Sequence, residues 1–237
     1  MTQGENRMAV KLFVSGLPGS GKSSVARYIS TYARDRQWST THINDYAILY
    51  RMFQEDTEGK QFKPAGHGGF DVLDLTVFDT ALKRLERQVS TYFSSAKSDE
   101  IILIEFARKD YQKAFHQFSS AFLQGAYFLY LTVDIKTCKR RIRERIAHPL
   151  TPDDHFVSDY IFREYYNKDN GQDIPHVLER DFGVDEQRVM VIDNTCTLQE
   201  ASPKINSFID FIIDSASSHV GTAIVLRSQL VYLRNPI

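Results

Sequence analysis

Eight residues near the start of the chain have the types and spacing of a phosphate-binding loop. The run GLPGSGKS, residues 16–23 and called the P-loop below, matches the pattern GxxxxGK[ST]. An apolar run at 9–14 precedes it and a segment of helical character at 24–29 follows it, which is the strand–loop–helix setting that the pattern requires. The glycines let successive backbone N–H groups turn toward a polyphosphate, and the helix N-terminus adds the positive end of its dipole. The sequence therefore predicts that this chain binds a nucleoside triphosphate.

The polar residues of the P-loop have distinct expected roles. Lys22 is expected to reach the β- and γ-phosphates of ATP as a catalytic residue, and the Ser23 hydroxyl is expected to ligate Mg²⁺. The residues of this segment expected to contact ATP are Gly16, Pro18, Gly19, Ser20, Gly21, Lys22, Ser23 and Ser24. The alternative is a glycine-rich turn that only connects a strand to a helix.

Two carboxylates follow predicted strands and are candidates for the chemistry around the phosphates. Glu105 ends the apolar run at 101–104 and is expected to hold Mg²⁺ beside Ser23, because open parallel sheets bind ligands at the carboxyl ends of their strands. Asp45 follows the predicted strand 39–44, where it could orient or deprotonate an attacking hydroxyl. The alternatives are an acid that only terminates a strand, for Glu105, and a helix N-cap, for Asp45 or its neighbour Asn44.

Four arginines are candidate ligands of phosphate or of a phosphoryl acceptor. Arg108 lies where the chain leaves the strand before Glu105, and Arg51 lies in the helix expected after Asp45; both are expected to bind the acceptor. Arg141 and Arg145 are four residues apart in the arginine-rich segment 139–146 and therefore share a helix face. They are expected to act in catalysis by clamping the transferred phosphoryl group. The alternatives are solvated arginines throughout, or an RNA-contacting patch at 139–146.

Apolar runs alternate with amphipathic stretches along the chain, a pattern typical of a parallel sheet covered by helices. The third strand is the most apolar and is expected to be central and buried on both faces. Strands are expected at 9–15, 39–44, 101–104, 126–133 and 188–192. Helices are expected from the P-loop to 36 and at 46–54, 76–94, 135–146, 156–167 and 197–213.

Two segments do not fit this alternation. The stretch 56–71 is rich in glycine and charge and is expected to be an irregular, mobile loop. The runs 222–226 and 230–233, near the end of the chain, have the composition of strands. They could add edge strands, pair with another subunit or lack order.

Composition excludes several classes of protein. With 29 basic and 30 acidic residues the net charge is −1, so no global positive field favours nucleic acid, although a local basic cluster leaves it possible. The two cysteines have no metal-like spacing and are expected to be free thiols in a reducing compartment. No apolar stretch approaches the roughly 20 residues of a membrane helix, so a soluble, cytoplasmic protein without a membrane partner is expected.

At four places the sequence resembles the nucleoside-monophosphate-kinase and small-molecule-kinase branch of the P-loop NTPases. The P-loop resembles the GxPGxGK[ST] form of these kinases, and Glu105-Phe106-Ala107-Arg108 resembles the Asp-Gly-Phe-Pro-Arg run of adenylate kinases, with Glu in place of Asp and one residue fewer. The segment from Cys138 to Arg145 resembles the helix that opens their lid. Val191-Ile192-Asp193-Asn194-Thr195 resembles the end of the fifth strand in dephospho-coenzyme-A kinases, which implies that Asn194 contacts ATP.

The resemblance implies a three-layer α/β/α P-loop NTPase fold with a five-stranded parallel sheet. The kinase domain is expected at 8–214, with an acceptor-binding helical insertion at 46–97, a short lid at 141–156 and a tail of undefined role at 215–237. The implied activity transfers the γ-phosphoryl group of ATP, with Mg²⁺, to a hydroxyl or phosphate of a small-molecule or nucleotide acceptor. Segment 56–74 matches no nucleotide-binding pattern, so the acceptor stays open. The alternatives are an ATP-binding regulatory or interaction module and a polynucleotide 5′-end kinase.

Overall fold

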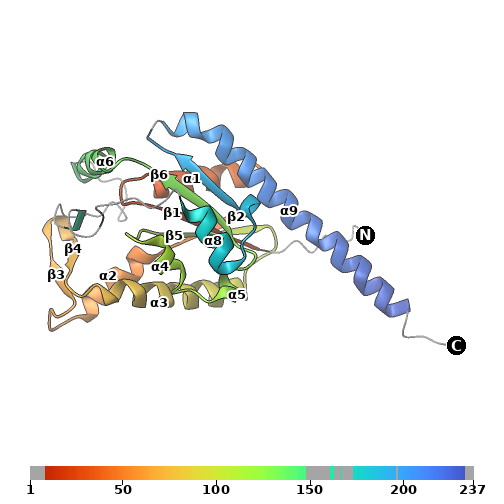
Figure 1. Cartoon of the computed structure of the whole chain (residues 1–237), viewed down its shortest axis with the longest axis horizontal. Coiled ribbons are helices and arrows are strands. Elements are labelled where there is room, and N and C mark those ends of the chain that lie inside the picture. The colour runs from red at the N-terminus through yellow and green to blue at the C-terminus, as the bar shows by residue number, and fades with distance from the viewer. Residues whose placement is uncertain (1–8, 148–160, 163–165, 167–172, 196, 233–237) are drawn as a thin grey trace.

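The computed structural model describes residues 9–147, 161–162, 166, 173–195 and 197–232 of the 237-residue chain (Figure 1). Five parallel strands form the central sheet in the order β2-β5-β1-β6-β7. Their bounds are β1 Val10–Gly16, β2 Ser39–Asn44, β5 Glu100–Phe106, β6 Tyr127–Thr132 and β7 Val189–Asp193. All five lie where the sequence predicts strands, and β1, not β5, is the middle one. β5 is nevertheless buried along its whole length, as its apolar composition predicts.

Helices cover both faces of the sheet, which gives the predicted three-layer α/β/α architecture. One face is covered by α2 Asp45–Glu55, α3 Thr76–Phe93, α4 Tyr111–Phe115, α5 Ser120–Leu123 and α8 Ile174–Phe182. The other face is covered by α1 Lys22–Arg34 and α9 Leu198–Tyr232. The remaining helix, α6 Ile135–Ala147, follows β6. Three of these helices, α4, α5 and α8, have no counterpart among the predicted elements.

Alternating residues of each strand supply the two cores. In β5, Ile102, Ile104 and Phe106 pack toward α2 and α3, and Ile101 and Leu103 pack toward α1 and α9. Phe13 in β1 is fully buried and stacks on Phe128 in β6, with ring centroids 4.9 Å apart. Because helices cover both faces, the carboxyl ends of the strands are where a ligand can approach the middle of the sheet.

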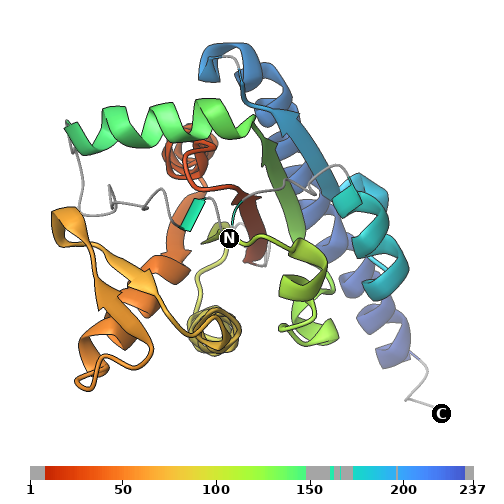
Figure 2. The same ribbon diagram turned by 60° about the vertical axis from the view of Figure 1, so that its left-hand side comes forward.

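The predicted irregular loop at 56–71 is a small β-hairpin instead. Strands β3 Phe62–Pro64 and β4 Phe70–Val72 pair antiparallel across a 3₁₀ turn, η1 Gly66–Gly68. Phe62 is buried and packs edge-on against Phe70, so an apolar contact fixes a segment whose glycines suggested a loop. The hairpin and α6 lie at the same end of the sheet (Figure 2).

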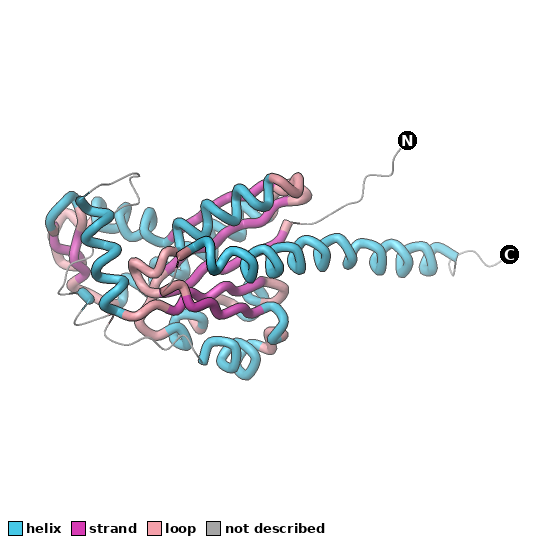
Figure 3. The backbone as a smooth tube through the Cα atoms, turned by 90° about the horizontal axis from the view of Figure 1, so that it is seen from above, coloured by secondary structure: helices cyan, strands magenta, loops and turns pink. Residues whose placement is uncertain are grey.

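The C-terminal runs of strand-like composition belong to a helix as far as residue 232, after which the described residues end. α9 continues to Tyr232, past the predicted boundary between domain and tail, and its far end projects beyond the sheet (Figure 3). The first half of α9 packs on the sheet through Ile205, Phe208, Ile209 and Ile212. From there the helix continues through the β-branched residues of the run 222–226, because intrinsic strand propensity is only a weak preference. None of the helices in the described part of the chain has the length and apolar composition needed to cross a membrane.

Candidate active site

The P-loop connects β1 to α1 with three glycines at positive φ. A Cβ on Gly19, at φ 80°, would lie 2.5 Å from the Cys138 carbonyl oxygen, so α6 packs directly on the loop and leaves no room for a side chain. Gly21 is the N-cap of α1, and no side chain of the described residues caps that helix. The N–H groups of its first turn can therefore bind an anion.

The Lys22 side chain lies inside the P-loop, and backbone carbonyl groups orient its ammonium group. Its side chain is buried, and Nζ donates hydrogen bonds of 3.0 Å to the carbonyl oxygens of Gly16 and Leu17. Burial lowers the pKa of Lys22, and Arg145 lowers it further, whereas Glu105 and Asp45 act in the opposite direction. The charges of three residues from distant parts of the sequence thus act on Lys22.

Ser23 and Glu105 form an oxygen-rich pair at the ends of α1 and β5. The Ser23 hydroxyl lies 3.1 and 3.2 Å from the two carboxylate oxygens of Glu105. His42 Nε2 lies 2.9 Å from Glu105 Oε2, and hydrogen bonds and nearby positive charge lower the pKa of Glu105 despite the effect of its burial. A hydroxyl beside an ionised carboxylate fits Mg²⁺, which binds to one or two protein oxygens and completes its shell with water and phosphate.

Asp45 and Arg108 form a buried ion pair between the ends of β2 and β5. Their side chains are 9% and 3% exposed, and Arg108 also donates a 2.8 Å hydrogen bond to the Phe78 carbonyl oxygen. Burial raises the pKa of Asp45, against the opposing effect of the Arg108 and Lys22 charges. Asn44 accepts the N-cap hydrogen bond of α2, which leaves the Asp45 carboxylate to Arg108. Arg108 therefore pairs with Asp45 in this structure, and its predicted contact with an acceptor stays a prediction.

The two lid arginines have different surroundings. Arg145 lies close enough to Lys22 for its positive charge to lower the pKa of Lys22, and its predicted role as a phosphate clamp stays a prediction. Arg141 donates to the carbonyl oxygens of Asn194, at 2.9 Å, and Thr195, at 3.3 Å, so it braces the chain after β7 beside the loop. The buried Asn194 side chain donates a 2.7 Å hydrogen bond to the Ser20 carbonyl oxygen and therefore helps to hold the P-loop in place.

The side chains of two further predicted site residues are exposed, and their contacts with ATP or an acceptor stay predictions. Arg51 is exposed on α2, and the described residues offer it no hydrogen bond or ion pair. Ser24 is exposed and interacts with Arg27, 3.3 Å away. The part of the predicted lid from 148 to 156 and most of the predicted helix 156–167 lie outside the described residues.

The sequence interpretation missed two residues of the site, His42 and Tyr111. In the β2–β5 register His42 pairs with Leu103, so it lies on the same face as Glu105, one diagonal step away. His42 could have been identified as a neighbour of Glu105 if the order and register of the strands had been known. The Tyr111 hydroxyl contacts Gly16 at the start of the P-loop, and no motif marks it.

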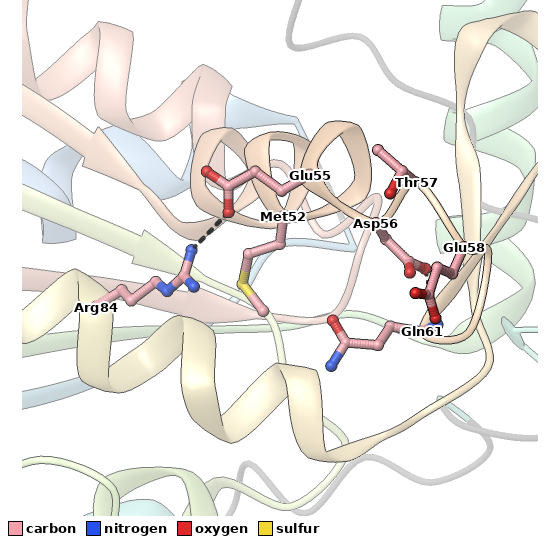
Figure 4. A pocket seen from close by; sticks show the side chains of 7 residues that line it. All are labelled: Met52, Glu55, Asp56, Thr57, Glu58, Gln61 and Arg84. Carbon is pink, nitrogen blue, oxygen red and sulfur yellow. Dashed lines mark hydrogen bonds and ion pairs between the residues drawn. The ribbon is translucent and has the colours of Figure 1, made fainter.

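A separate cavity of about 280 Å³ lies between the far end of α2, the chain that follows it and α3 (Figure 4). Glu55 on its wall pairs with Arg84, 3.3 Å away. Asp56 accepts hydrogen bonds from the backbone N–H groups of residues 60, 61 and 62. Its acidic groups therefore serve the local structure, and no P-loop residue lines it.

Comparison with known proteins identifies the fold. No family model and no curated protein matches the chain. A gluconokinase from Sinorhizobium meliloti 1021 is similar in structure, at 16% identity and a TM-score of 0.51 over 88% of this chain and 96% of that one. The Mycobacterium tuberculosis APS kinase CysC, solved with AMPPNP and APS, is 11% identical, with a TM-score of 0.50 over 86% and 98%. Chaetomium thermophilum Kti12, solved with ADP-AlF3, is 12% identical, with a TM-score of 0.51 over 86% and 97%.

At these identities the likeness is one of fold. The predicted resemblance is confirmed at that level, since each of these structures aligns with at least 86% of this chain. The five parallel strands, the covering helices and the glycine-rich loop between β1 and α1 are together the fold of the P-loop kinases.

Proposed function

We propose that this chain is a P-loop kinase that transfers the γ-phosphoryl group of ATP to a hydroxyl or phosphate of a small-molecule or nucleotide acceptor. The observation that carries the proposal is the geometry of the P-loop. Lys22 Nζ is held by the carbonyl oxygens of Gly16 and Leu17, and the Ser23 hydroxyl lies beside the Glu105 carboxylate. Phosphoryl transfer needs positioning and charge stabilisation more than covalent chemistry, and an arrangement of this kind supplies both.

The residues have complementary roles in this proposal. The loop amides and Lys22 hold the β- and γ-phosphates, and Ser23 and Glu105 would hold Mg²⁺, which neutralises phosphate charge when it is bound. Asp45 orients the acceptor hydroxyl and takes up its proton. Arg108 binds the acceptor after its ion pair with Asp45 has opened. Arg145 stabilises the charge on the transferred group. Among the fold relatives, the APS kinase was solved in complex with both AMPPNP and APS, which supports a site for an acceptor as well as for a nucleotide.

One observation favours a nucleotide-binding module without an acceptor as the second candidate. Asp45 and Arg108 neutralise each other in the interior, so neither charge is presented to a ligand in this conformation. Such a module would bind ATP and hydrolyse it slowly at most. A polynucleotide kinase has less support, because the hairpin side of the molecule carries Glu55, Asp56 and Glu58 beside Lys60 rather than a continuous basic groove.

The test is turnover of ATP with Mg²⁺ in the presence of pooled acceptors. The pools contain nucleosides, nucleotides, sugars, small hydroxylated metabolites and 5′-hydroxyl oligonucleotides, and products are identified by mass spectrometry. One pool that yields a phosphorylated product well above the rate of ATP hydrolysis supports the kinase and names the acceptor class. Tight ATP binding without product in any pool supports the second candidate.

A further inference from the structure

Tyr111 brings a buried hydroxyl group to the first glycine of the P-loop. Its oxygen lies 2.7 Å from the Gly16 nitrogen and 2.9 Å from the Gly16 carbonyl oxygen. The residue is 2% exposed, and its ring packs edge-on against Tyr130, with centroids 4.9 Å apart. The Asp110 side chain caps α4 at the residue before Tyr111, so the start of this short helix fixes the backbone from which the ring extends.

The hydroxyl joins the two sides of the candidate site. It accepts from the Gly16 N–H and, at 3.4 Å, from the Arg108 N–H. Its single proton goes to the Gly16 carbonyl oxygen or to the Phe106 carbonyl oxygen, 3.3 Å away. Tyr111 thus holds the start of the P-loop against the end of β5, where the acceptor residues begin.

The same Gly16 carbonyl oxygen directs Lys22. An ammonium group has three N–H donors, and Lys22 uses two of them on the carbonyl oxygens of Gly16 and Leu17. The orientation of the Gly16 carbonyl therefore decides where the remaining donor points. Gly16 has φ 144°, and a glycine peptide has few steric restraints of its own, so the hydroxyl that binds both its N–H and its C=O group restrains it.

We propose that Tyr111 is a positioning residue that aims the Lys22 ammonium group at the nucleotide phosphates by fixing Gly16. This inference rests on the proposed nucleotide-binding function of the P-loop and adds a residue that no motif marks. The hydroxyl acts as a hydrogen-bonding group and not as an acid, because burial raises the pKa of Tyr111 and keeps it protonated at neutral pH.

The test is a double-mutant cycle between Tyr111 and Lys22, read as the Kd for ADP by titration calorimetry on the full chain. Tyr111→Phe removes the hydroxyl and keeps the ring contacts. We expect Tyr111→Phe to raise Kd about tenfold, equivalent to about 1.4 kcal/mol, in the wild-type background. We expect less than about a twofold effect in the Lys22→Met background, since no ammonium group is left to aim.

Tyr92→Phe is the matched control, and urea unfolding of each variant separates stability from binding. The Tyr92 hydroxyl also makes side-chain hydrogen bonds, 2.7 Å to Glu100 and 2.8 Å to Thr41, but at the other end of the sheet, and its loss is expected to leave Kd unchanged. Equal effects of Tyr111→Phe in both Lys22 backgrounds, or wild-type affinity of Tyr111→Phe, would overturn the inference alone. Absence of ADP binding by the wild-type chain would overturn the proposed function and the inference together.

Discussion

Arg108 and Asp45, which are 63 residues apart in sequence, form an ion pair in the interior between the ends of β5 and β2. The Arg108 guanidinium also lies over the Phe78 ring, 4.9 Å from its centroid. In the interior each of these two charges is stabilised by the other. A ligand that binds to one of the two side chains must therefore replace the ion pair with the other. Under the proposed function, the pair therefore links the stability of the fold to the binding of an acceptor.

Removal of one member of this pair is expected to destabilise the protein strongly. Asp45→Ala leaves a buried, uncompensated guanidinium and should lower the free energy of unfolding by about 3 kcal/mol. The double variant Asp45→Ala/Arg108→Met should be more stable than Asp45→Ala, because it buries no unpaired charge. Urea unfolding of the two single variants and the double variant measures the coupling. Single variants within about 0.5 kcal/mol of wild type would show that the pair is not buried in solution.

His42 is expected to support the Mg²⁺ site through Glu105. His42→Gln should raise the Mg²⁺ concentration for half-maximal turnover about tenfold, since groups that orient a metal ligand have effects of this size. His116→Gln is the control, because His116 also contacts a carboxylate, Asp181 at 3.2 Å, but at the C-cap of α4. Equal Mg²⁺ dependence of the two variants would show that His42 does not support the Mg²⁺ site.

Gly19 is expected to tolerate no side chain. Gly19→Ala must displace the Cys138 carbonyl, 2.5 Å from the added Cβ, and should abolish detectable nucleotide binding. Gly183→Ala is the control: Gly183 also has positive φ, at 65°, but nothing lies within 4 Å of an added Cβ. That variant should lose only about 1 kcal/mol of stability and keep its affinity. The comparison uses calorimetric titration with ADP, and normal binding by Gly19→Ala would contradict the contact between α6 and the loop.

Glu100 is expected to make stability depend on pH at the amino end of the sheet. Its carboxylate accepts hydrogen bonds from Thr41, Tyr92 and the Lys97 N–H, and these lower its pKa below the ordinary 4.5. Because the folded pKa is the lower one, this stabilisation is present above pH 4.5 and is lost as the pH falls through the folded value. Urea unfolding at a series of pH values should show a weaker acid dependence for Glu100→Gln, and identical profiles would exclude this role.

The sequence predicts the sheet and the P-loop because both depend on local patterns. The apolar runs of β1 and β5 have the length and composition of buried strands, and the lysine and serine of the loop have fixed positions after its glycines. Glu105 could be predicted beside Ser23 because parallel strands place their carboxyl ends together.

Non-local contacts explain what the sequence does not predict. The hairpin at 62–72 depends on the packing of Phe62 and Phe70, and the late part of α9 continues a helix that is anchored elsewhere. The register of β2 against β5 brings His42 to the site. Tyr111 reaches it from α4, a five-residue helix too short to show a periodic pattern in the sequence. Arg108 was expected to meet an acceptor, and its contact with Asp45 depends on the relative placement of two strand ends.

The most direct test of the central claim follows the γ-phosphoryl group itself. ATP labelled in its γ-phosphate is incubated with Mg²⁺ and the acceptor pools, and the label is traced to products for the wild-type chain and for Lys22→Met, whose folding is checked by urea unfolding. The kinase account predicts label in one acceptor with wild type and none above background with Lys22→Met. Label recovered only as inorganic phosphate, or equal transfer by Lys22→Met, would contradict it.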